Sequence, residues 1–147
     1  GEIEAVDNGD ATITVTYKDQ SFSFPVKIDF QKLTVPLDIK PDDPRNTINL
    51  NSQGPVRVAI LSTDAFAASR VNARTVKFGP AGAPPDLEHV KTQDVNRDGR
   101  DDVVLRFRIQ ETGIECGETT ADLTGRTLLG DRLTGTDAIR VVGKACR

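Results

Sequence analysis

The stretch 94–102, DVNRDGRDD, combines residue types and spacing that suit a metal ion. Oxygen-bearing side chains stand at its first, third, fifth and ninth positions, which are Asp94, Asn96, Asp98 and Asp102. Gly99, at the sixth position, permits the sharp turn that brings such side chains round one point. Arg100, at the seventh, can offer its backbone carbonyl oxygen. Because the stretch has no His or Cys, its all-oxygen donor set favours calcium over zinc, and over magnesium, which demands a smaller octahedral shell.

The twelfth position distinguishes this stretch from an EF-hand, where a bidentate Glu would stand. Here that position is Leu105, inside an alternating apolar pattern typical of a strand. We therefore expect a calcium loop of the D-x-N-x-D-G-x-x-D type between two strands, similar to the calcium loops in the blades of integrin-type propellers. The alternative is a turn without metal, since Asp, Asn and Gly favour turns for backbone reasons alone.

A second polar cluster surrounds Pro41 and Pro44, which fix a turn between two predicted strands. Its carboxylates and amides are Asp38, Asp42, Asp43, Asn46 and Asn49. Such residues cap turns without any ligand. A second cation site or a ligand contact is the alternative interpretation.

No catalytic set can be assembled around the other ionisable residues. His89 is the single histidine, and we interpret it as a surface residue rather than a general base. Glu115 and Glu118 are an acid pair of the kind that glycosidases use, but a solvated turn explains them as well. The absence of Trp and the single Tyr count against a site where a sugar stacks on an exposed ring. We expect a protein that is not an enzyme, with a small glycan hydrolase as a weaker alternative.

The elements that must position these residues are mainly strands, because apolar and polar residues alternate with a period of two. The predicted strands lie at 12–17, 21–28, 33–39, 55–61, 103–109 and 137–142, and residues 122–127 and 132–137 form a predicted hairpin. Only 63–69 is typical of a short helix. Many short strands separated by turns predict an all-β fold, an antiparallel β-sandwich of the Ig-like or jelly-roll-like kind.

Composition limits the classes of function that remain. A chain of 147 residues fits one domain, or one domain with a short appendage. The net charge is −3 and the basic residues are scattered, so a nucleic-acid partner is not expected. No apolar run is long enough for a membrane span. Cys116 and Cys146 favour a disulfide and an oxidising compartment, although two buried free thiols in a cytosolic protein are the alternative.

From Leu37 to Cys146 the chain resembles an accessory module that recurs in secreted and surface proteins of bacteria and archaea. The residues that carry the resemblance are Asp38-Ile-Lys-Pro, Asn46-Thr-Ile-Asn-Leu, Val58-Ala-Ile-Leu, Val76-Lys-Phe-Gly-Pro, the 94–102 stretch, Thr112-Gly-Ile-Glu-Cys-Gly, Leu123-Thr-Gly and the final Cys. Asp42 stands where the family pattern usually has Gly. The resemblance implies calcium ligands at Asp94, Asn96, Asp98 and Asp102, and paired cysteines.

The resemblance also implies a division of the chain and a location. Residues 32–147 would be the β-sandwich module, and residues 1–31 a hairpin extension or the end of a preceding domain. We expect a non-catalytic, calcium-stabilised accessory or binding module of a secreted or cell-surface protein. The alternatives are a calcium-dependent carbohydrate-binding module of a polysaccharide-degrading enzyme and a protein–protein adhesion module, so a polysaccharide or another surface protein is the candidate partner.

Overall fold

The computed structural model describes residues 9–17, 20–28, 32–144 and 146. Contacts divide the chain into two compact units, Gly1–Gln31 and Lys32–Arg147. In the first unit, β1 (Gly9–Tyr17) pairs antiparallel with β2 (Gln20–Ile28). Their register sets Ile13 opposite Phe24.

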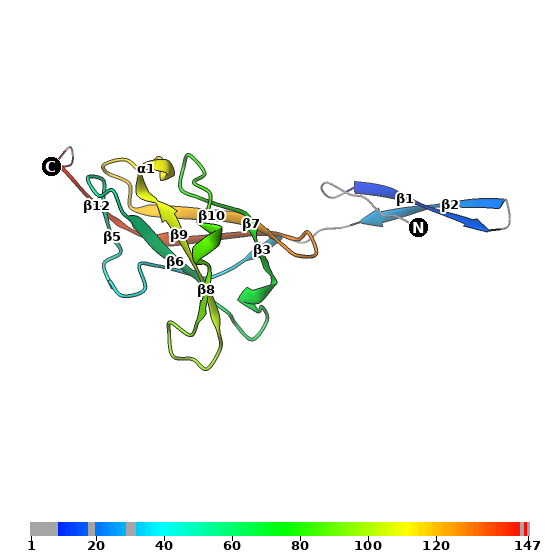
Figure 1. The fold of residues 1–147 in the computed structure, drawn as a ribbon, viewed down its shortest axis with the longest axis horizontal. Helices are drawn as coiled ribbons and strands as arrows, with labels where there is room; N and C mark the ends of the chain where they lie inside the picture. The colour runs from blue at the N-terminus through cyan, green and yellow to red at the C-terminus, as the bar shows by residue number, and fades with distance from the viewer. Residues whose placement is uncertain (1–8, 18–19, 29–31, 145, 147) are drawn as a thin grey trace. The chain divides into compact units, whose positions relative to one another are not determined.

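The second unit contains two four-stranded sheets and a small parallel pair of strands (Figure 1). Sheet one has the order β3 (Lys32–Thr34), β11 (Arg132–Ala138), β10 (Thr120–Thr127), β7 (Val71–Phe78). Sheet two has the order β4 (Leu37–Ile39), β6 (Pro55–Ile60), β9 (Asp102–Arg108), β8 (Lys91–Gln93). The parallel pair is β5 (Thr47–Asn49) with β12 (Arg140–Val142). The predicted all-β, sandwich-like fold is confirmed.

The core lies between the two sheets, because each contributes its apolar face to one continuous buried cluster. The rings of Phe78 in β7 and Phe107 in β9 meet there, with centroids 5.1 Å apart. Along β9, Leu105 and Phe107 are buried and Arg108 is exposed, although Asp102 and Val104, on the same face as the arginines, are buried as well. Sheet two therefore keeps one face of β9 for the core and turns its arginines outward.

The hairpin of β10 and β11 is confirmed, and its register explains the repeated Leu-Thr-Gly. Thr124 pairs with Thr134, so each leucine stands opposite a glycine of the other strand. A Cβ atom at Gly135 would lie 2.6 Å from Cγ of Leu37. The missing side chain thus lets the chain that leaves β3 pass closely over this sheet.

The helix predicted over 63–69 is wrong. Thr63 and Phe66 instead exchange backbone hydrogen bonds of 2.7 and 3.3 Å in a tight turn, and a 3₁₀ turn, η1 (Ala68–Arg70), follows it. Another short 3₁₀ turn, η2 (Leu87–His89), precedes β8, and one helical turn, α1 (Ile109–Thr112), follows β9 and ends at Gly113, whose φ is +72°. In the described part of the chain no helix is long and apolar enough to cross a membrane.

Two predicted strands, 33–39 and 137–142, are each divided between sheets. Pro36 separates β3 from β4, and its carbonyl accepts a hydrogen bond from the amide of Leu61, which directly follows β6 of sheet two. β11 likewise ends at Ala138 and β12 begins at Arg140. The period-two pattern runs through both crossings because the chain stays extended and keeps facing the same core, so alternation alone does not reveal where it changes sheet.

Candidate metal centre

The stretch 94–101 is the loop between β8 and β9, which are antiparallel neighbours. Gln93 pairs with Asp102, so the loop is closed at its base by the sheet itself. Figure 1 shows this yellow-green loop and the helical turn α1 at opposite ends of β9. The ninth-position acid thus sits on a strand, while the other predicted ligands sit on the loop.

Three carboxylates converge at this place. Asp94, Asp98 and Asp102 each offer one oxygen, and these three oxygens lie within 4.8 Å of one another. Within the described residues, these three acids form the one group of three or more His, Cys, Asp or Glu side chains placed so that they could hold a metal ion. The amide of Asn96 points at the same place: with its nitrogen turned inward it would donate to Oδ1 of both Asp94 and Asp98 at 3.0 Å. With its oxygen turned inward, the same geometry supplies a further oxygen donor.

Backbone hydrogen bonds shape the loop before any ion binds. Asp94 accepts from the amides of Asp98 at 3.2 Å and Gly99 at 2.9 Å, and Asp98 accepts from the amide of Arg100 at 2.9 Å. Gly99 has φ +86°, a left-handed conformation that a side chain would strain. The loop is therefore wound round its own carboxylates, which lowers the conformational cost of binding a cation.

Asp102 connects the loop to the body of the sandwich. Its side chain is fully buried, and its two oxygens accept hydrogen bonds from the amides of Ser62 at 2.8 Å and Val95 at 3.0 Å. Each carboxylate oxygen has a second lone pair, so these bonds leave Asp102 able to ligate a metal. Asp102, the first residue of β9, thus connects this strand to the beginning of the loop through its hydrogen bond with Val95.

Ser62 is a positioning residue that the sequence analysis did not identify. Its hydroxyl donates to the carbonyl of Asp101 at 2.6 Å and accepts from the amide of Ala68 at 2.8 Å. Together with the Ser62 amide on Asp102, these bonds tie the loop to η1. Ser62 follows β6 without any motif, so no sequence pattern marked it.

Arg100 is one of two arginines in the loop and pairs with acids on both sides. Its guanidinium pairs with Asp64 of the 63–66 turn, and Nη1 lies 3.7 Å from Oδ2 of Asp98. The predicted use of its backbone carbonyl as a ligand stays a prediction. The side chains that could act as ligands all offer oxygen atoms and together carry three negative charges, which fits a hard divalent cation such as calcium.

The second polar cluster is dispersed over separate local contacts. Asp43 accepts hydrogen bonds from the amide of Thr47 at 2.9 Å and then that of Arg45 at 3.0 Å, and these bonds lower the pKa of its carboxyl. Asp42 pairs with Arg57 at 2.8 Å. Asn46 is buried and donates to Asp137 at 2.9 Å, and Asn49 accepts from the Asn51 amide at 3.0 Å. These contacts stabilise the turn and bind it to the end of β11.

Asp38, the fifth member of that cluster, gives a pH-dependent prediction. Burial, followed by the negative charges of Asp137, Asp42 and Asp102, raises the pKa of its carboxyl above 3.8. Folding thus disfavours the ionised form of Asp38. The contribution of this carboxyl group to the stability of the fold is full at pH values below the unfolded pKa and is lost as the pH rises through the folded pKa.

We therefore expect Asp38→Asn to raise the melting temperature at pH 7, with a difference from wild type that shrinks as the pH falls through the folded pKa and disappears below about 4. Thermal melts from pH 3 to 7 measure this, with Asp101→Asn as the matched control, because Asp101 is exposed and does not contribute to the shift at Asp38. A gain that is equal at both ends of the range would contradict the linkage.

The predicted disulfide is confirmed, because Cys116 and Cys146 are bonded with their Cα atoms 5.3 Å apart. Neither cysteine is free, so the alternative of two buried thiols is wrong. The bond joins the segment after α1 to the C-terminal end of the described chain. It lies beyond the end of β9 that is opposite to the 94–101 loop.

The remaining ionisable candidates lie on the surface. His89 ends η2, and its Nδ1 lies 2.6 Å from Oδ2 of Asp86, a hydrogen bond that lowers the pKa of the Asp86 carboxyl. Glu115 and Glu118 belong to one exposed turn, in which the Glu115 amide donates to the Glu118 side chain at 2.9 Å.

In sequence comparisons, no family model and no curated protein matches this chain.

Proposed function

We propose that residues 32–147 form a non-catalytic, calcium-stabilised accessory or binding module of a secreted or cell-surface protein. The observation that carries the proposal is the convergence of three carboxylate oxygens within 4.8 Å in a loop already wound round them. Without a cation, three negative charges crowd one turn and repel one another. A hard divalent ion removes that repulsion and takes the oxygens as ligands.

The bound ion would act on the fold through Asp102 and Ser62. Ligands from the loop and from β9 would be held together, and the hydrogen bonds of Ser62 would pass that restraint to η1. An ion that binds only the folded chain stabilises it by about 2.7 kcal/mol at a hundredfold excess over the dissociation constant. Extracellular calcium modules bind at about 10⁻⁴–10⁻³ M, so stability would follow the calcium concentration outside cells.

The disulfide supports the proposed location. Disulfides form and persist in oxidising compartments and are rare in the cytosol. Calcium is plentiful in the same compartments. A surface or secreted location thus accounts for both stabilising features at once.

The test is thermal unfolding with calcium and with EDTA. We expect the melting temperature to fall on chelation by roughly 5–10 °C, since about 2.7 kcal/mol corresponds to a shift of that order in a domain of this size. Asp98→Asn should melt near the chelated value and lose most of its response to calcium. Asp101→Asn removes one charge from the same loop outside the converging group, and it should respond as the wild type does. Identical melts with and without EDTA, in a sample shown to be metal-free, would contradict the proposal.

A further inference from the structure

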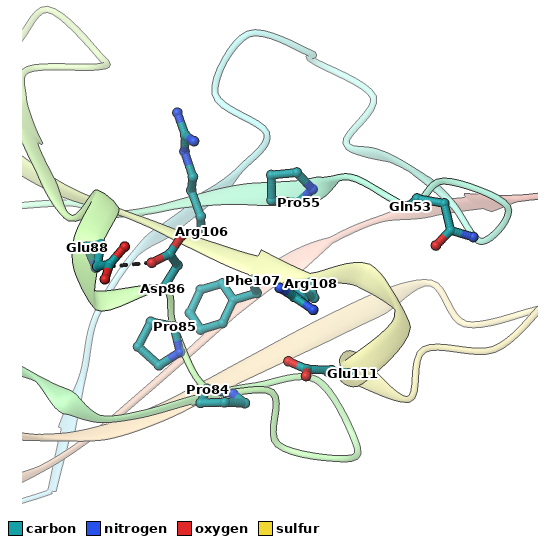
Figure 2. Close-up of a pocket in the computed structure, with 10 residues that line it drawn as sticks. All are labelled: Gln53, Pro55, Pro84, Pro85, Asp86, Glu88, Arg106, Phe107, Arg108 and Glu111. Atoms are coloured by element: carbon teal, nitrogen blue, oxygen red, sulfur yellow. Dashed lines mark hydrogen bonds between the residues drawn. The ribbon is translucent and has the colours of Figure 1, made fainter.

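A cleft of about 660 Å³ lies at the end of β9 away from the 94–101 loop (Figure 2). Pro84 and Pro85 form one part of its wall and Pro55, at the start of β6, another. The volume falls within the roughly 300–1,000 Å³ typical of ligand sites. Proline rings have few conformations, so these walls are preformed.

The cleft contains two arginines from β9, Arg106 and Arg108, on the outward face of sheet two. Arg106 stands directly opposite Arg57 of β6, and like charges in that position destabilise a sheet. Arg57 is neutralised by Asp42 at 2.8 Å. In the described residues no carboxylate lies within ion-pairing distance of Arg106 or Arg108. Both guanidinium groups are thus available to an anionic ligand.

Two acids flank the arginines. Glu88 belongs to η2, which is attached near Arg106 because the Asp86 amide donates to the Arg106 carbonyl at 2.9 Å. Glu111 follows Arg108 by three residues, in α1. Figure 2 shows Glu88 on one side of the cleft and Glu111 on the other, with Arg108 on the side of Glu111. Asp86 also lines the cleft, and its negative charge acts on Arg106, so the charges along the cleft are negative at Glu88 and Asp86, positive at the two arginines and negative at Glu111.

This lining favours a peptide over a glycan or a nucleic acid. The only aromatic side chains of residues 32–147 are Phe66, Phe78 and Phe107, all buried, so no exposed ring is offered to a sugar. The flanking acids would repel a uniform polyanion. Arg106 and Arg108 are two residues apart on a strand, so their Cα atoms repeat at about 6.4–6.8 Å, the repeat of same-face residues in any extended peptide.

We propose that this cleft binds an extended peptide segment that presents two acidic side chains on one face, flanked by basic ones. The acidic side chains would pair with Arg106 and Arg108, and the basic ones with Glu88 and Glu111. The peptide's apolar stems would lie on the proline walls. The proposal goes beyond the calcium module and does not rest on it, since the loop and the cleft occupy opposite ends of β9.

The test is an NMR titration of the ¹⁵N-labelled chain at low ionic strength, with calcium present throughout. The probe is the capped peptide Lys-Thr-Glu-Thr-Glu-Thr-Lys, and the control is Glu-Thr-Lys-Thr-Lys-Thr-Glu, which has the same composition with the charges exchanged. We expect the probe to shift the amides of residues 53, 54, 86–88 and 106–111 and to bind several-fold more tightly than the control. Two exposed ion pairs change affinity by about 2- to 30-fold, so the double variant Arg106→Gln/Arg108→Gln should bind about tenfold more weakly.

Arg57→Gln is the matched variant, because it removes a neighbouring charge that Asp42 already neutralises. It should keep the wild-type affinity within about twofold. Equal affinity for the two peptides, shifts at other residues, or no shifts up to about 5 mM peptide, above the millimolar range of weak binding, would each overturn the proposal. If the chain fails this peptide test but its melting temperature still depends on calcium, the peptide proposal is overturned and the proposed function is unaffected.

Discussion

We expect the Asp102→Ala variant to have a free energy of unfolding about 2–4 kcal/mol lower than that of the wild type and to lose its response to calcium. The fully buried carboxylate accepts hydrogen bonds from the amides of Ser62 and Val95, and alanine leaves both donors without a partner. A buried donor that loses its acceptor costs about 1–3 kcal/mol. The variant also removes the one proposed ligand that belongs to a strand. Both losses act on the same loop.

Urea unfolding with and without calcium separates the two effects. The loss seen without calcium reports the hydrogen bonds, and the missing calcium increment reports the ligand. Asp102→Asn is the matched variant, because it keeps the size and one acceptor oxygen and should lose less stability than alanine. It also keeps the test usable if alanine prevents folding. A loss under about 1 kcal/mol for Asp102→Ala would mean that the two amides find other acceptors, contrary to the structure.

Removing the disulfide is expected to lower the free energy of unfolding by about 3–4 kcal/mol on the chain-entropy estimate. Cys116 and Cys146 are separated by 30 positions, and the bond closes a loop that contains β10, β11 and β12. Opening it returns conformational freedom to the unfolded chain. The double variant Cys116→Ser/Cys146→Ser measures the effect in urea.

A reductant provides the control for the disulfide. It should destabilise the wild type by a similar amount and leave the double serine variant unchanged. The calcium increment should survive in that variant, because the bond lies beyond the opposite end of β9 from the loop. An equal denaturation midpoint for wild type and variant would show that the bond contributes nothing to stability.

Much of the architecture could be predicted because alternation reports burial directly. The pattern Val103, Leu105, Phe107 places one face of β9 in the core, and the paired Leu-Thr-Gly stretches predict the β10–β11 hairpin. The same pattern failed at Pro36 and Ile139, where an extended chain changes sheet and still faces one core. The separate helix prediction at 63–69 failed because helix propensity is weak compared with the fixed contacts of Ser62 with η1.

The candidate metal centre was predictable in its loop but not in its surroundings. The spacing of Asp94, Asn96 and Asp98 places three oxygen donors in one turn, and the local geometry of the chain is enough to bring them together. The buried state of Asp102 and its hydrogen bond from Ser62 depend on a partner 40 positions away, which no local pattern encodes. The cleft at Arg106 was missed for the same reason, since its walls come from segments that are distant in the sequence.

Diffraction from crystals grown in ample calcium tests the central claim most directly. The account predicts one ion in the 94–102 loop, with oxygens of Asp94, Asn96, Asp98 and Asp102 at about 2.3–2.6 Å from it. Carboxylates turned away into solvent, with no ion between them at that calcium concentration, would contradict it.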